Sequence, residues 1–334
     1  MSLPGRGTPS RERKSSQLVP ILCLLGVVAL LSSITPATKF VFRQSGMSFL
    51  DLACGRVVIG FLFLAAVTAF LDRRGLCALR LGDCLLLGSV GFLGVGAYAI
   101  AAWGLQYTSV THYALVYSLL PTFTTLLSCM LGRDRSTPLM WLGILLSWGG
   151  CVLAISDGFR FQDVQFEFGD ALALLFTAMM SAHIAFSGSI VKRHGVLTSN
   201  TAMFGTSALL ISACTVTWAD TPQQDNPSMG VLGAVLFIGL GTAGVFLLRC
   251  RSLQSLSPAT VGAYHNLIPI STIGIAHLSL DEPLTLQTVV GAAAVMLGTE
   301  IVRRGPLDPN WLKSLRLLFL PTSGSARPPL QTPK

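Results

Sequence analysis

Apolar residues along this chain fall in long, nearly continuous runs separated by short polar segments. A helix of about 20 residues crosses a hydrocarbon core of about 30 Å, because it rises about 1.5 Å per residue. Ten runs meet this length, namely residues 18–42, 49–71, 82–106, 110–131, 137–156, 170–190, 198–219, 229–248, 258–280 and 284–301. The pattern predicts an all-α integral membrane protein with ten transmembrane helices.

Composition supports this prediction and narrows the partners. Hydrophobic residues make up 51% of the 334 residues and charged residues only 11%, whereas soluble domains carry about 25% charged residues. The formal net charge is +8, but the basic residues are spread over tails and short loops. No aromatic residues interleave with them, as a nucleic-acid platform would require. We therefore expect a lipid bilayer as the partner and no nucleic acid.

The distribution of basic residues predicts the orientation. Most of the 23 Lys and Arg residues lie in the two tails and in alternate loops, whereas acidic residues gather around 157–169 and 220–228. By the positive-inside rule, both termini are cytoplasmic, with residues 1–17 and 305–334 as tails. Arg249 and Arg251 are counted here as residues of a cytoplasmic loop. The first apolar run is too long for a signal-peptide core, so we expect a multi-pass protein of a cell membrane.

The two halves of the chain match at a constant offset of 148 residues. The matched pairs include a proline, a loop acid and two glycines: Pro121 with Pro269, Asp134 with Glu282, Gly143 with Gly291, and Gly150 with Gly298. Residues 18–156 and 170–304 form the repeats, and residues 157–169 form an external linker. Because each repeat has five spans, the second must enter the membrane inverted, which is a transporter architecture with a site near the midplane.

Several local sequences resemble one family when taken in order. The second span begins with Leu-Ala-Cys-Gly-Arg at 52–56, and the third leads into the fourth through residues 102–109, before Pro121. The second half repeats this at 253–259, before Pro269, and Asp-Glu-Pro precedes the last span at 281–283. The pattern resembles the drug/metabolite transporter superfamily, EamA type, over about residues 18–304. The resemblance implies ten helices in two five-helix repeats and a bacterial inner membrane.

Two charged residues within predicted spans are candidates for substrate binding. A charge at mid-bilayer costs about 2.5–3.5 kcal/mol on insertion scales, so each needs a compensating interaction. Arg56 either holds carbonyls of a neighbouring helix or serves as a cavity cation for an anionic group such as a carboxylate. Lys39 lies nearer the outer edge, where it either snorkels to the interface or takes part in substrate binding or gating.

Other candidates come from spacing and from the repeat. Tyr113, Tyr117 and Pro121 share one helix face because they are spaced by four, and His265 and Pro269 are the repeat partners of the last two. The prolines, including Pro36, are expected to bend their helices and to shape a central cavity or simply the packing. The remaining candidates are Tyr264 and His265, which join Tyr113 and Tyr117 as candidates for substrate binding, and His183 and His265 for proton coupling or simple hydrogen bonding.

These features favour a secondary transporter, with export as the expected direction, for a small organic metabolite such as an amino acid or related amphiphile. No nucleotide-binding loop follows a strand, so coupling is to a gradient or to downhill flow. An intramembrane hydrolase or lipid-modifying enzyme, using His183 and Ser187, is one alternative, and a non-transporting scaffold is another. The eight cysteines suggest no metal site, no cofactor is expected, and a homodimer remains open beside a monomer.

Overall fold

The computed structural model describes residues 10–132, 137–155, 166–217, 228–255, 264–265 and 267–304, and its regular elements there are helices. The helices are α1 (Ser10–Ser45), α2 (Phe49–Leu71), α3 (Arg73–Cys77), α4 (Leu81–Gly91), a π-helical turn η1 (Phe92–Gly96), α5 (Ala97–Tyr107), α6 (Val110–Tyr117), α7 (Leu120–Met130), α8 (Pro138–Ile155), α9 (Phe168–His194), α10 (Val196–Thr217), α11 (Met229–Ser255), α13 (Leu267–Leu280) and α14 (Leu286–Arg304).

Within the described residues, eight helical segments are long and apolar enough to cross a membrane. The α4–η1–α5 segment counts as one of them, and so does the α6–α7 segment. Two further apolar helices, Leu267–Leu280 and Leu286–Val302, are shorter and correspond to the ninth and tenth predicted spans. Most of the predicted ninth span before Leu267 lies outside the described residues. The chain is therefore a multi-pass, all-helical membrane protein.

Short polar residues mark where the helices begin and end. The Ser109 hydroxyl accepts a hydrogen bond from the amide of His112 at 3.0 Å, and Ser48 caps α2 in the same way through Leu50. The side chain of Asp170 accepts from the Glu167 amide at 3.1 Å, which completes a capping box at the start of α9. Gly195 ends α9 with a φ of 81°, a conformation that glycine adopts without steric cost.

The helices differ from the sequence prediction at several points. Helix α1 begins at Ser10 instead of Leu18, so it includes part of the predicted N-terminal tail. The predicted third span contains the π-helical turn η1. The predicted fourth span is interrupted between α6 and α7, just before Pro121. Proline lacks an amide hydrogen and is best tolerated in the first helical turn, which is where α7 places it. Residues 1–9, 157–165 and 305–334 of the predicted tails and linker lie outside the described residues.

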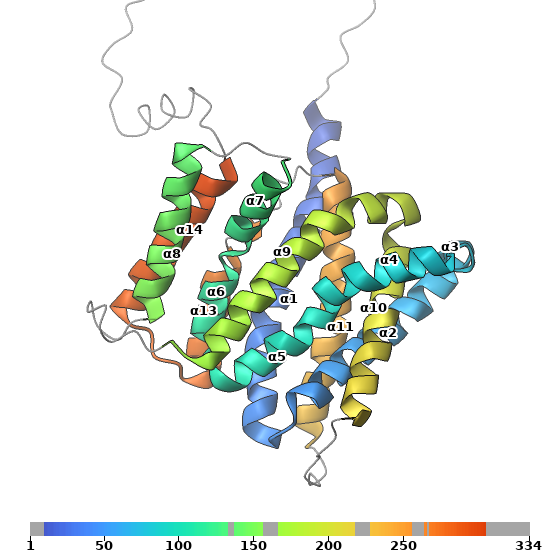
Figure 1. Cartoon of the computed structure of the whole chain (residues 1–334), viewed down its shortest axis with the longest axis horizontal. Helices are drawn as coiled ribbons and strands as arrows, with labels where there is room; N and C mark the ends of the chain where they lie inside the picture. Colours follow the sequence, from blue (N-terminus) through green and yellow to red (C-terminus); the bar gives the residue numbers. More distant parts are fainter. Residues whose placement is uncertain are drawn as a thin grey trace, which may run out of the picture.

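Helices α8 and α14 lie side by side at one edge of the molecule, and their backbones come very close (Figure 1). A β-carbon on Gly143 would lie 2.8 Å from the carbonyl oxygen of Gly298. One on Gly150 would lie 2.8 Å from the carbonyl oxygen of Gly291. Residue numbers rise along α8 as they fall along α14, so the two helices run antiparallel. Small residues allow this close approach, as they do in many membrane helix pairs.

The remaining helices pack in pairs around the centre. Helix α1 packs on α11, α5 on α9, and α2 on α10 (Figure 1). Large apolar side chains cover much of the outer surface, among them Leu22, Phe70, Leu145, Leu209 and Leu278. An aqueous surface rarely carries so much exposed apolar area. These side chains therefore form the surface that contacts lipid.

Candidate functional site

An internal cavity lies where six helices meet. The empty space among its lining atoms amounts to about 470 Å³, a volume that includes space open to the surroundings. Helices α1, α2, α5, α6, α9 and α13 contribute the lining residues Leu31, Ile34, Thr35, Thr38, Arg56, Tyr98, Ala101, Leu105, Tyr113, Ala114, Tyr117, Phe176, Ile268 and Thr272. A mainly apolar cavity with a few polar groups is the usual form of a small-molecule site.

Arg56 is the charged residue of this cavity. Its side chain is only 4% exposed, and its Nε donates a hydrogen bond to the Thr242 hydroxyl at 2.7 Å. Its Cζ lies 3.7 Å from the ring centroid of Tyr98, within the range of a cation–π interaction. Within the part of the chain that the structure describes, no residue accepts a hydrogen bond from the two terminal NH₂ groups. Among the described residues, the protein thus fixes the cation through Nε and leaves its terminal NH₂ groups for a ligand.

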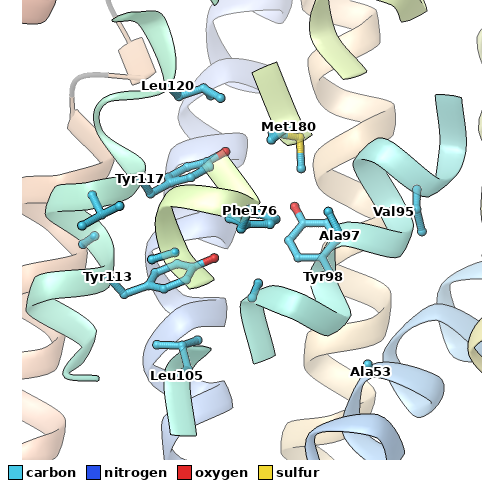
Figure 2. Packing of buried hydrophobic residues seen from close by; sticks show 14 of the residues in the cluster. Ala53, Val95, Ala97, Tyr98, Leu105, Tyr113, Tyr117, Leu120, Phe176 and Met180 are labelled. Carbon is cyan, nitrogen blue, oxygen red and sulfur yellow. The ribbon is translucent and has the colours of Figure 1, made fainter. Parts of the chain in front are cut away.

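Three tyrosines, one of them Tyr98, surround Phe176 in this region (Figure 2). The ring centroid of Phe176 lies 5.3 Å from Tyr98, 5.9 Å from Tyr113 and 5.6 Å from Tyr117. Figure 2 shows the hydroxyl groups of Tyr113 and Tyr117 pointing to the same side, toward Tyr98. The hydroxyls of Tyr117 and Thr272 are buried without a hydrogen-bond partner among the described residues. Buried polar groups are normally paired, so these two are available to a bound molecule.

Lys39 has a different environment from Arg56. Its ammonium group donates to the carbonyl oxygens of Leu105 at 2.7 Å and Thr108 at 2.8 Å. These carbonyls end α5, where no further helical turn supplies partners. Lys39 is not among the residues that line the cavity. The structure therefore places it at a helix end beside the cavity, one turn along α1 from Thr35.

The turn between α5 and α6 is held by two acids from the second half of the chain: Glu282, in the loop between α13 and α14, and Asp170, in the first turn of α9. The carboxylate of Glu282 accepts hydrogen bonds from the amides of Val110 at 2.8 Å and Thr111 at 2.9 Å, and from the Thr111 hydroxyl at 2.7 Å. Asp170 accepts from the Thr108 hydroxyl at 2.6 Å. An acid at a helix N-terminus satisfies free amides and the helix dipole. The loop acid of the second repeat thus caps a helix of the first.

The predicted histidines lie away from the cavity. Nδ1 of His183 lies 2.9 Å from the carbonyl oxygen of Val90, just before the π-helical turn, and its ring meets Phe246 edge-on at 5.7 Å. Ser187, the nucleophile of the hydrolase alternative, is not bonded to it in the described part of the chain. His265 and its neighbour Tyr264 are half-buried and do not line the cavity.

The three prolines occupy different positions in their helices. Pro36 is buried within α1, which continues past it without interruption. Pro121 stands in the first turn of α7, after the break that follows α6. Pro269 is buried near the start of the described part of α13. Of these three, only Pro121 coincides with an interruption between described helices.

Two residues of this region were not predicted from the sequence. Tyr98 is neutral, belongs to no repeat pair, and gave no signal. Arg249 was assigned to a cytoplasmic loop, and that assignment was wrong: it lies within α11 and is only 8% exposed. A basic residue at the end of an apolar run cannot be assigned to loop or helix by counting charges alone.

Together these observations define a multi-pass helical membrane protein with an internal cavity that combines a buried cation with aromatic and hydroxyl groups. The chain belongs to the EamA-like transporter family, whose model matches residues 18–156 and again residues 167–304. The two matches divide the chain as the repeat analysis did. The cavity takes residues from both matched regions, since α9 and α13 belong to the second.

Two proteins with similar sequences are also described as transporters. An uncharacterized transporter of Archaeoglobus fulgidus is 26% identical over 245 residues, covering 72% of this chain and 84% of the relative. The uncharacterized transporter YetK of Bacillus subtilis is 26% identical and covers 77% of each chain. A protein of known structure superposes on this chain with a TM-score of 0.58 at 17% sequence identity. The match covers 86% of this chain and 96% of the other. That likeness supports the fold alone.

Proposed function

We propose that this protein is a secondary transporter, working as an exporter, for a small organic metabolite that carries an anionic group, such as an amino acid or related amphiphile. The observation that carries this proposal is Arg56, buried in the cavity with its terminal NH₂ groups free of acceptors among the described residues. Hydrogen bonds between an arginine and a carboxylate are among the strongest in proteins. The tyrosine and phenylalanine rings would contact the apolar part of the same molecule.

The helix packing supports an alternating mechanism between inverted halves. In the two repeats, α1 corresponds to α9, α2 to α10, α5 to α11 and α8 to α14. Exchanging the repeats therefore turns the packed α1–α11 pair into the packed α9–α5 pair, and it leaves the α2–α10 and α8–α14 pairs unchanged. The glycines obey the same exchange: Gly143 meets Gly298, and its repeat partner Gly291 meets Gly150. Such reciprocal contact is the signature of a two-fold axis. The antiparallel arrangement of α8 and α14 supports the proposal that this axis relates halves of opposite orientation.

Reporter fusions test the inversion. We expect alkaline phosphatase, which is active only outside the cytoplasm, to be active when fused after residue 162 and inactive when fused after residue 334. A green fluorescent protein fused at the same positions should give the reverse pattern. Five crossings precede the first position and ten precede the second in the proposed topology. Equal activity at both positions would rule out two inverted five-helix halves.

Transport itself is tested in proteoliposomes. The purified protein is reconstituted, and movement of a radiolabelled panel of amino acids, monocarboxylates and amines is compared with that in protein-free liposomes. We expect protein-dependent flux of at least one carboxylate and a smaller flux of the matching amine without a carboxylate. Flux equal to that of protein-free liposomes for every compound would contradict the proposal.

A further inference from the structure

Arg249 presents an unusual environment for a charged side chain. It is buried in α11, and its Nε and Nη2 nitrogens have no hydrogen-bond partner among the described residues. Its Cζ lies 5.9 Å from the ring centroid of Phe246, a weak cation–π contact. A buried guanidinium with unpaired donors is costly unless a ligand supplies the acceptor.

The position of Arg249 relates it to the cavity. Thr242, which binds Arg56, precedes Arg249 by seven residues on α11. Seven residues make about two helical turns, so both side chains leave the same face of α11 about 10 Å apart along its axis. The hydroxyl of Tyr117, which lines the cavity, lies beside the Arg249 guanidinium without a hydrogen bond of good geometry. Tyr117 therefore stands between the two arginines.

We propose that Arg249 forms a second anion-binding site near the C-terminal end of α11. This site receives the carboxylate of the solute after the carboxylate leaves Arg56. Its unpaired nitrogens donate to the carboxylate, the Tyr117 hydroxyl donates a further hydrogen bond, and the Phe246 ring bounds the site. Two buried cations, Arg56 on α2 and Arg249 on α11, allow an anionic group to pass between them without crossing an apolar stretch unpaired. The transfer rests on the proposed function, whereas anion binding at Arg249 does not.

Binding of benzoate, a carboxylate with an aromatic ring, tests this site in detergent-purified protein. Equilibrium dialysis with radiolabelled benzoate, corrected for empty micelles, measures the number of sites. We expect R56Q to retain one saturable site and R56Q/R249Q to lose it, with at least a tenfold rise in the dissociation constant. R56Q/R249K should retain binding, since the charge remains, and R56Q/R251Q is the matched control, because Arg251 is an exposed arginine two residues farther along α11. Unchanged binding in R56Q/R249Q, or no saturable binding in R56Q, would overturn the proposal.

A second measurement needs no substitution at Arg249, which protects the test against misfolding. Phenylglyoxal modifies accessible arginine side chains, and mass spectrometry reports the modified fraction of each. In R56Q, benzoate should slow modification of Arg249 several-fold and leave that of Arg251 unchanged. Equal modification rates of Arg249 with and without benzoate would overturn the second site. Failure of the parent protein to transport any compound would reject the proposed function and leave this binding result to be judged separately.

Discussion

Replacing Arg56 by glutamine is expected to lower kcat/KM for transport of the accepted carboxylate by about 10- to 100-fold, because a charge-assisted hydrogen bond contributes about 1.5–3 kcal/mol. The cavity residue Arg56 is held by Thr242 and by the Tyr98 ring, so its donors are preorganised. Glutamine keeps a polar group of moderate length but removes the charge. The measurement is initial flux in proteoliposomes over a range of substrate concentrations.

Two variants separate charge from position at this residue. Arg56→Lys keeps the charge and loses the Nε that binds Thr242, so it should recover only part of the flux. Arg251→Gln removes an exposed cation from α11 and should transport like the parent. If R56Q transported carboxylates as well as the parent protein, Arg56 would be a packing residue and the cavity would lack its proposed anion site.

The fold was largely predictable because lipid imposes simple rules on sequence. Every backbone polar group must be satisfied within the hydrocarbon region, so long apolar runs become helices, and the runs starting at Phe49 and at Val110 begin where predicted. The 148-residue offset paired Gly143 with Gly291 and Gly150 with Gly298, but it did not predict that each glycine contacts the counterpart of the other. The π-helical turn η1 was not predicted, and its Gly94 packs against a residue distant in sequence. A β-carbon at Gly94 would collide with His183 of α9.

The site was only partly predictable, because its members are defined by distance in space. Arg56, Tyr113 and Tyr117 were candidates and do line the cavity, since a buried charge and a spacing of four are visible in the sequence. Tyr98 lies on another helix with no charge or repeat partner to mark it. Arg249 looked like a loop residue because it follows an apolar run, but α11 continues to Ser255 and so includes it as a buried residue.

The second large effect is expected at the contact between α8 and α14. Replacing Gly150 by valine should lower the thermal unfolding midpoint strongly, or prevent recovery of folded protein, because the new β-carbon would lie 2.8 Å from the carbonyl oxygen of Gly291 and from the backbone nitrogen of Val295. These atoms belong to the backbone, so no flexible side chain can move aside. Overpacking typically costs about 1–3 kcal/mol, and separating two helices would also remove their remaining contacts.

The neighbouring residue provides a matched control. Gly149 lies on the exposed face of α8, and a β-carbon there would meet nothing within 4 Å. Gly149→Val makes the same chemical change one position earlier in the same helix, so helix propensity and added volume are equal in the two variants. Fluorescence-detected size-exclusion chromatography after heating should therefore show a parent-like midpoint for G149V and a much lower one for G150V. Equal midpoints for the two variants would mean that α8 and α14 do not meet through their glycines, and the reciprocal contact that supports inverted halves would be lost.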